Sequence, residues 1–261
     1  MGTRSISADE CFAIDRFSVS EIRLRNRLLD EQHEIVFAAL PSAGAACNEV
    51  CELVGGEQFD NVHPLEAAGR VVAEDLCIMV LRDGAWRLDA AVLCFPSIWS
   101  LQEKLGRTTA DIHIPVAHYA DDLGRKVDRF FDGLRPGRAV ARRNLSVKPY
   151  PLLFLPVVKS DQPVDAFDTG ADGSPWWLRS EWQTLQRLPR SGAILFTIKL
   201  QLAPAKVLLD RPDRARDLLM MYRSWDDDMW RFKAAANDLR LSFIPWLERA
   251  TASQFGDGPF G

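Results

Sequence analysis

The sequence predicts an α+β fold in which a mostly antiparallel sheet is flanked by N-terminal and C-terminal helices. Helical spacing of apolar residues dominates both ends of the 261-residue chain, and a hairpin signal with several short apolar runs lies between them. Neither an internal repeat nor an interdomain linker is visible. We therefore expect one domain over residues 1–261, with N-terminal helices in 18–55, a core in about 62–202 and C-terminal helices in 204–250.

The composition is that of a globular protein and argues against two kinds of partner. Hydrophobic residues make up 47% and charged residues 26%, and the net charge of −4 offers no general attraction for nucleic acid or an anionic membrane. No apolar stretch approaches the roughly 18 residues that span a bilayer, and MGTRSISADECF lacks the features of a signal peptide. Five cysteines without a small-scaffold framework are typical of reduced thiols. We expect a cytoplasmic protein that binds neither nucleic acid nor membranes.

The N-terminal part is expected to be helical. Residues 20–39 carry charges on one side and apolar residues at helical spacing on the other. Ser42 can cap a second helix that runs to about Val54, and the glycine pair after it ends that helix. Pro64 suits the first position of a short third helix.

The centre of the chain is expected to form the sheet. Strands Leu76–Leu81 and Trp86–Phe95 flank Asp83-Gly84, a strong tight-turn signal. A helix carrying Trp99 should then run from Pro96-Ser97 to Gly106, followed by an amphipathic helix over 119–134. The remaining expected segments are a strand around Arg142, a strand Leu152–Val158, an acidic loop 159–175, an extended stretch 176–188 and a strand Ala193–Leu202.

Three polar residues on one expected strand give the first candidate site. Arg142, Asn144 and Ser146 alternate, so their side chains should point the same way. His113 lies nearby in a loop stiffened by a proline, and we interpret the group as a site rather than as a solvent-facing stripe. A lone histidine beside apolar residues is also commonly a satisfied core residue, and His63 is the second choice as a ligand.

A second polar group is expected where residues 176–188 are extended, because Arg179, Glu181 and Gln183 then share a face. Together with Arg142 and Arg187, Arg179 could form ion pairs with Glu181 and the acidic loop, or hold the carboxylates of a ligand. A haem presents two propionates, so one histidine with several arginines fits a haem pocket. Dinucleotide, phosphate-loop, His-Glu-x-x-His and nucleophile-elbow motifs are missing.

Five segments resemble one family in this order: PLEAAGRVVAEDLCIM, CFPSIWSLQEKLG, IHIPV, VDRFFDGLRPGRAVARRNLS and RSEWQTLQRLPRSGAILFTI. They look like the haem-dependent oxidative N-demethylases, and the resemblance extends from about Phe17 to Trp246. It implies a PAS-like sheet, haem b bound through a histidine, and demethylation of a small secondary amine with oxygen. The roles implied are His113 as the ligand of the iron, Arg142, Asn144 and Arg187 at the cofactor, and Glu181 with Arg179 at the substrate.

The expected activity is that of a haem-dependent monooxygenase that oxidises an N-methyl amine and releases formaldehyde. Electrons should come from a separate flavin or iron–sulfur reductase. The alternatives are a haem-binding PAS sensor or non-catalytic subunit, a haem oxygenase for a different amine, and a scaffold that has lost haem and keeps its arginines and glutamate as ion pairs. Three departures from the family pattern, at Leu145, Trp182 and Lys199–Gln201, lie on the expected site strands and suggest a different substrate.

Overall fold

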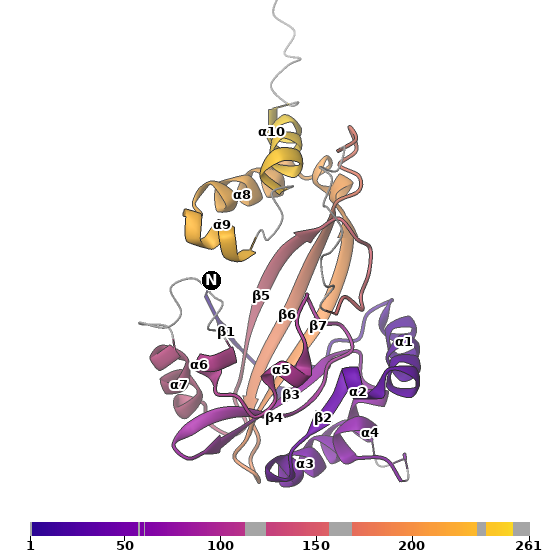
Figure 1. Cartoon of the computed structure of the whole chain (residues 1–261), viewed down its shortest axis with the longest axis vertical. Helices are drawn as coiled ribbons and strands as arrows, with labels where there is room; N and C mark the ends of the chain where they lie inside the picture. The colour runs from indigo at the N-terminus through magenta and orange to yellow at the C-terminus, as the bar shows by residue number, and fades with distance from the viewer. Residues whose placement is uncertain are drawn as a thin grey trace, which may run out of the picture. The chain divides into compact units, whose positions relative to one another are not determined.

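The computed structural model describes residues 2–56, 58–59, 61–112, 124–156, 169–233 and 239–252, and it confirms the α+β class (Figure 1). The chain falls into two compact units. Unit 1 comprises Met1–Asn144, Leu153–Val158 and Glu181–Leu200, and unit 2 comprises Leu145–Leu152, Lys159–Ser180 and Gln201–Gly261. The single domain over residues 1–261 and the PAS-like character of the sheet stay predictions.

Seven strands of the described residues form one sheet in the order β1-β5-β6-β7-β3-β4-β2. They are β1 Arg4–Ile6, β2 Phe37–Ala39, β3 Asp75–Arg82, β4 Ala85–Val92, β5 Ala139–Lys148, β6 Trp177–Arg187 and β7 Ile194–Pro204. The pairs β1–β5, β2–β4, β3–β4 and β3–β7 are antiparallel, as expected. Both edge strands have three residues, which leaves few unpaired backbone groups for another chain to join.

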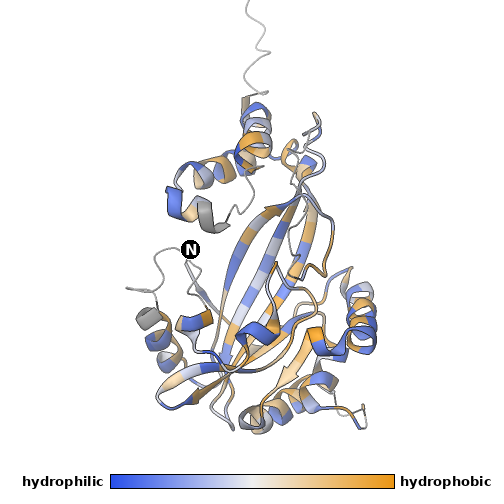
Figure 2. Ribbon diagram, in the orientation of Figure 1, coloured by the Kyte–Doolittle hydropathy of each residue, from blue (hydrophilic) through white to orange (hydrophobic). Residues whose placement is uncertain are grey.

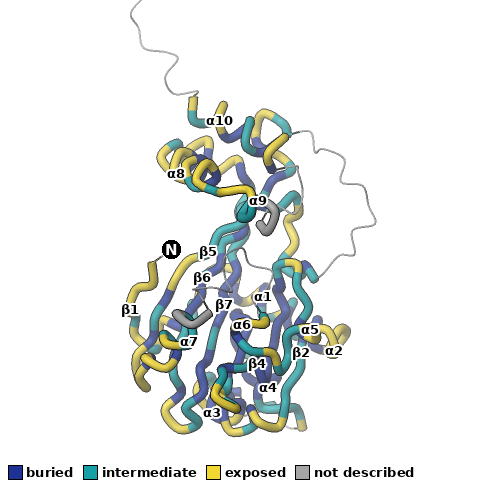
Figure 3. Tube along the Cα trace, turned by 60° about the vertical axis from the view of Figure 1, so that its left-hand side comes forward, coloured by how far each residue is buried: buried dark blue, intermediate teal, exposed yellow. Residues whose placement is uncertain are grey.

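The predicted hairpin is confirmed as β3 and β4. Asp83 and Gly84 have φ values of +52° and +74°, the left-handed conformation that a type I′ turn needs at both central positions. A bulge between Ile78 and Met79 shifts the register once. Most residues of both strands are buried (Figure 3).

The described helices begin and end as follows: α1 Ser18–Glu31, α2 His33–Val36, α3 Gly44–Val54, α4 Pro64–Val71, α5 Leu101–Lys104, α6 Thr109–Ile112, α7 Gly124–Gly133, α8 Pro212–Arg223, α9 Asp227–Lys233 and α10 Ile244–Ala252. The predicted helix after Ser42 is confirmed as α3, which ends at Gly55 with a φ of +72°. The helix at Pro64 is confirmed as α4, and His63 caps it by accepting a hydrogen bond from the Leu65 N–H. None of the described helices is long and apolar enough to cross a membrane.

The single helix expected over residues 20–39 is wrong. Helix α1 ends at Glu31, and Gln32 leaves the helical region with a φ of −131°. After the short α2, residues Phe37–Ala39 form β2 and pair with β4. The hydrogen bonds of this ladder replace those of a continued helix, and periodicity within one segment cannot reveal them.

Two expectations between the hairpin and β6 are also wrong. A helix from Pro96-Ser97 to Gly106 is reduced to α5, because Ser97 forms a parallel bridge with Leu155 and Ile98 takes a left-handed φ of +60°. Trp99 therefore lies before the helix. The expected strand Leu152–Val158 is, in its described part, an irregular segment with that one bridge. Helix α7 confirms the described part of the helix expected over 119–134, whereas most of the acidic loop 159–175 lies outside the described residues.

Unit 2 has its own apolar core, and it contains the helices predicted after Pro204. Trp176 and Tyr222 pack with Phe243 and Trp246 in this core. Its α8 and α10 are joined by α9 and by a π-helical turn at Leu239–Phe243. These aromatic contacts hold the helices of the unit together.

The sheet of unit 1 has two buried faces. On the α1 face, β3 and β7 pack against α1, α3 and α4 through a cluster that includes Leu28, Val50, Leu65, Ile78 and Leu195. On the α7 face, the cluster includes Trp86, Leu88, Phe131 and Ile194, packed with Val140 and Leu185. Hydrophilic residues interrupt the long strands β5 and β6 (Figure 2), and their alternation decides which face each one meets.

Candidate functional site

A polar network lies on the α7 face, where β5 and β6 are neighbours. Glu181 and Gln183 share this face because they alternate with Leu185 of the α7-face cluster. Glu181 is 8% exposed, and Ser97 Oγ donates to its Oε1 at 2.9 Å. Its Oε2 accepts from Asn144 Nδ2 at 3.2 Å and from Gln183 Nε2 at 2.7 Å. All the donors described at this carboxylate are neutral, so hydrogen bonds solvate its charge without cancelling it.

Arg142 reaches Glu181 only through Gln183. Its Nε donates to Gln183 Oε1 at 2.6 Å, while the amide nitrogen of Gln183 donates to Glu181. Arg142 is exposed and Gln183 is buried. The network therefore runs from an exposed arginine through one amide to a buried carboxylate.

Apolar side chains continue the same face of the sheet. Val140 of β5 and Phe196 of β7 pack on the α7-face cluster, as do Trp99 and Ile112 of the segment between β4 and α7. Ile112 is the last residue of α6. His113, the predicted iron ligand, follows it in the sequence and lies outside the described residues, as does His118.

Two predicted site residues belong to unit 2. Arg179 is 1% exposed and donates to the Leu152 carbonyl at 2.6 Å. Ser146 alternates with Arg142 and Asn144 on β5, as predicted, and its buried hydroxyl has no hydrogen-bond partner among the described residues. The roles expected for these residues stay predictions.

Arg187 lies at the other end of β6. It is six residues from Glu181, or about 20 Å along an extended strand. Its Nη1 donates to the carbonyls of Asp132 and Leu134 at 3.4 Å, and its guanidinium lies over the Trp86 ring. The structure thus brings Arg142 and Asn144 to Glu181 and does not bring Arg187 there.

The two described histidines are engaged on the α1 face. His33 pairs with Glu66 at 3.0 Å. His63 uses Nδ1 to accept the Leu65 N–H, so the neutral ring carries its proton on Nε2 and has no second lone pair for a metal. Burial lowers the pKa of His63, which favours this neutral form. Phe37 of the α1-face cluster lies between the two rings.

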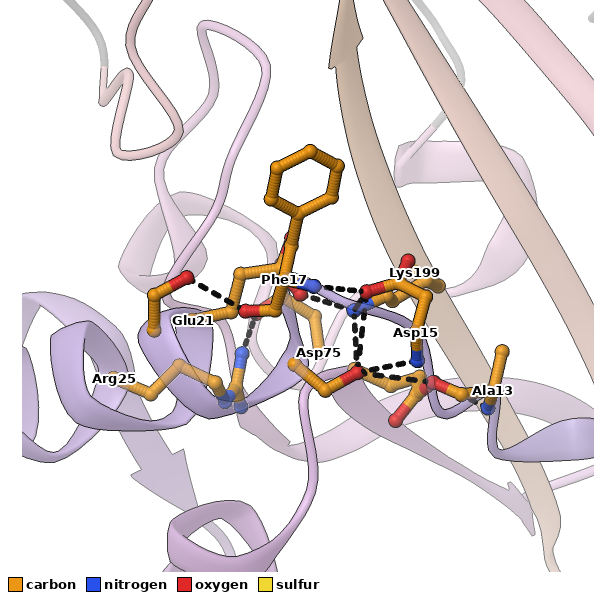
Figure 4. Close-up of polar contacts among 10 residues, drawn as sticks. Ala13, Asp15, Phe17, Glu21, Arg25, Asp75 and Lys199 are labelled. Atoms are coloured by element: carbon orange, nitrogen blue, oxygen red, sulfur yellow. Dashed lines mark hydrogen bonds and ion pairs between the residues drawn. The ribbon is translucent and has the colours of Figure 1, made fainter.

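A different network occupies the α1 face (Figure 4). Thr197 and Lys199 of β7 point to this face, since Thr197 bonds Thr184, which lies on the side of β6 opposite Glu181. Lys199 is fully buried and pairs with Glu21 of α1 and, at 3.6 Å, with Asp15.

Arg25 and Asp75 complete this α1-face network. Arg25 is fully buried and binds Asp75 at 2.6 Å, while Asp75 also accepts the N–H groups of Cys94 and Phe95. Burial raises the pKa of Asp75 and likewise those of Glu21 and Glu74. Within the described residues, no three His, Cys, Asp or Glu side chains gather as a metal site on either face.

Trp182 and Lys199, which belong to two of the three departures from the family pattern, have side chains directed away from Glu181. Trp182 lies on the opposite side of β6, where the guanidiniums of Arg4 and Arg143 stack on its ring at 4.8 and 5.0 Å. Lys199 belongs to the α1-face network. These two side chains therefore lie on the opposite side of the sheet from Glu181, and the different substrate that the sequence suggested stays a prediction.

Sequence reasoning placed Gln183 on one face with Glu181, by alternation on a predicted strand, but did not name it as a site residue. It missed Ser97 altogether. Ser97 gave no such signal, since Pro-Ser before an apolar segment is typical of a helix start. Only the bridge to Leu155 places it beside the carboxylate.

Residues 53–238 match the family model described as haem-dependent oxidative N-demethylase, alpha subunit-like. The matched region covers well over half of the 261-residue chain and includes every residue of the Glu181 network. The chain belongs to this family.

Proposed function

We propose that the protein is a haem-dependent monooxygenase that removes a methyl group from a small secondary N-methyl amine. Membership of the family supports the haem and the class of reaction. The observation that carries the proposal further is the carboxylate of Glu181, buried and held by neutral donors alone among the described residues. Such a group can neutralise a cationic ligand that enters the site.

The bound haem supplies the oxidation of the methyl group by dioxygen. In sum, the amine, one O2, two electrons and two protons give the demethylated amine, formaldehyde and water. The protein has to hold the amine with one methyl group at the reacting centre, exclude competing orientations and admit protons. Positioning of this kind contributes a large part of the rate of many enzymes.

The carboxylate of Glu181 is assigned as the group that binds the ammonium group of the substrate. A secondary amine is a cation at neutral pH, and a cation loses less free energy on leaving water when a carboxylate meets it. Ser97, Asn144 and Gln183 fix both carboxylate oxygens, so the ammonium N–H would meet a preorganised acceptor. Arg179 as a second catalytic residue stays a prediction.

The residues of the α7 face fit a haem in two respects. Arg142 is an exposed guanidinium, which suits a propionate, and Asn144 stands beside it on β5. Leu185 and Phe196 supply apolar surface on the same face. His113 is assigned as the iron ligand, because the family resemblance of IHIPV centres on it and because His33 and His63 each use one ring nitrogen in another contact.

A separate flavin or iron–sulfur reductase is assigned as the source of the electrons, since the sequence carries no motif for either cofactor. The family description, alpha subunit-like, supports a partner subunit. Haem b, the reductase and a small amine are thus the partners proposed for this chain.

An absorption spectrum tests the haem. The purified protein is expected to show a Soret band, which His113→Ala abolishes or shifts and His33→Ala leaves unchanged. His33→Ala is the matched control because it removes a histidine of the α1 face. Loss of the band in His63→Ala alone would assign the ligand to the earlier histidine.

Formaldehyde release tests the reaction. The haem-loaded protein is given dimethylamine or larger N-methyl amines with oxygen and an artificial electron donor. Formaldehyde in step with amine loss supports the proposal. A Soret band without formaldehyde from any N-methyl amine contradicts it and favours a non-catalytic haem-binding subunit.

A further inference from the structure

We infer that Gln183 is a positioning residue that couples the haem side of the site to its substrate side. This inference rests on the proposed function, in which Arg142 binds a propionate and Glu181 binds the amine. Gln183 is the one described residue that contacts both, at 2.6 Å through Oε1 and at 2.7 Å through Nε2.

The chemistry of the two neighbours dictates the orientation of the Gln183 amide. An arginine side chain can only donate hydrogen bonds, and an ionised carboxylate can only accept them. The reversed amide would place N–H against N–H on one side and oxygen against oxygen on the other. Gln183 can therefore hold Glu181 in a fixed position only while Arg142 binds the amide oxygen of Gln183.

A glutamine can do this only because its surroundings confine it. Gln183 is 6% exposed, and Leu185 on the same face of β6 packs into the α7-face cluster. Asn144 and Ser97 bind Glu181 independently, so the carboxylate keeps two donors when Gln183 is changed. Loss of the amide should displace Glu181 without unfolding the site.

Three outcomes follow for amine binding. Gln183→Leu removes one hydrogen bond to a charged group, which corresponds to about tenfold weaker amine binding. Arg142→Lys removes the Nε donor to the amide, and we expect it to weaken amine binding about threefold in the wild-type background. In the Gln183→Leu background the same Arg142→Lys change should have no effect on amine binding, because the connection is already broken.

The experiment is a titration of haem-loaded full-length protein with dimethylamine, followed by the shift of the Soret band. Gln186→Leu is the matched control, since Gln186 lies on the opposite face of β6 and its amide nitrogen has no partner among the described residues. It should bind amine as the wild type does. Turnover gives a second readout, in which Gln183→Leu raises KM by about the same factor and lowers kcat less. Gln183→Met replaces Gln183→Leu with the same expectation if the latter does not fold.

If the wild type binds the amine and Gln183→Leu or Gln183→Met binds it equally well, the inference is overturned but the proposed function is not. Equal effects of Arg142→Lys in both backgrounds overturn it too, because additive effects mean that no coupling passes through residue 183. A wild-type spectrum that no N-methyl amine perturbs overturns the proposed function and this inference with it.

Discussion

The two faces of the sheet carry polar networks built on different principles. On the α1 face, the fully buried cations Lys199 and Arg25 each meet a carboxylate inside the protein. On the α7 face, Glu181 is bound by neutral donors. The cation of that network, Arg142, is exposed and contacts Gln183, which lies between it and Glu181. Charges matched within the chain serve the fold, whereas a carboxylate bound only by neutral groups is suited to an external cation.

The energetics of the two networks should differ accordingly. Bringing a charge into the interior costs several kcal/mol, which a buried partner roughly offsets. The chain gains little net stability from such a pair, but it loses much when one partner is removed. A buried carboxylate with several neutral donors, such as that of Glu181, depends less on any single neighbour.

The largest expected effect is that of Lys199→Met on stability. The change leaves Glu21 buried without its cation, and it should lower the free energy of unfolding by about 3–5 kcal/mol. The double variant Lys199→Met with Glu21→Met removes both charges and should recover most of the loss. Chemical denaturation of the full-length protein measures both values.

Arg223→Ala is the control for Lys199→Met, because Arg223 pairs with Glu248 on the surface. An exposed pair is worth about 1 kcal/mol or less. A cost of this small size for Lys199→Met would mean that the α1-face network tolerates an unpaired charge, and the contrast between the faces would be lost.

The second expected effect is on turnover. Glu181→Gln keeps the shape of the side chain and removes its charge, so haem content should survive while N-demethylation falls by about 10²-fold or more. The assay is formaldehyde production from dimethylamine with an artificial electron donor. Glu103→Gln, an exposed glutamate of α5, should leave the rate unchanged. Full activity in Glu181→Gln would remove this residue from the site.

The sequence predicted the β6 part of the site better than the α1-face network. Alternation on one strand placed Arg179, Glu181 and Gln183 on a common face, and this follows from local geometry alone. On α1, the sequence indicated that charged residues face solvent, yet Glu21 and Arg25 are buried. Their partners Lys199 and Asp75 are far away in the chain, and no periodicity within the helix reveals them.

The same distinction explains the errors in secondary structure. The hairpin was predicted correctly because Asp83-Gly84 determines its turn locally. The end of α1 depends on the pairing of β2 with β4, and the conformation at Ser97 depends on its bridge to Leu155. Both are long-range contacts. Long-range contacts override local propensity at both places.

The third expected effect is a difference in haem retention between variants of two neighbouring arginines on β5. Arg142→Ala should weaken haem retention by about tenfold or more, because a charge-assisted contact contributes roughly 1.5–3 kcal/mol. Arg142→Lys should restore it only in part, since lysine lacks the bidentate fork. Arg143→Ala is the matched control, because Arg143 stacks on Trp182 on the other side of the sheet. Haem transfer to an acceptor protein measures retention, and equal losses in Arg142→Ala and Arg143→Ala would contradict the assignment of the α7 face.

The smallest expected effect concerns His63, on the α1 face. Burial lowers the pKa of His63 below its ordinary value of 6.5. As the pH falls through this range, the native state therefore binds fewer protons than the unfolded state. Stability is then present at higher pH and declines on acidification, because protonated Nδ1 can no longer accept the Leu65 N–H. The decline should equal the loss of a helix cap, about 1 kcal/mol or less.

His63→Asn keeps a capping side chain without a titratable group, so its stability should not show this decline between pH 7.5 and 5. Thermal unfolding of both proteins at the two pH values measures the difference. The variant should also keep its haem, because the proposed haem lies on the α7 face and His63 packs on the other side against Phe37. Loss of the Soret band in His63→Asn would place the haem on the α1 face, beside the buried charges, and would reverse the roles assigned to the two faces.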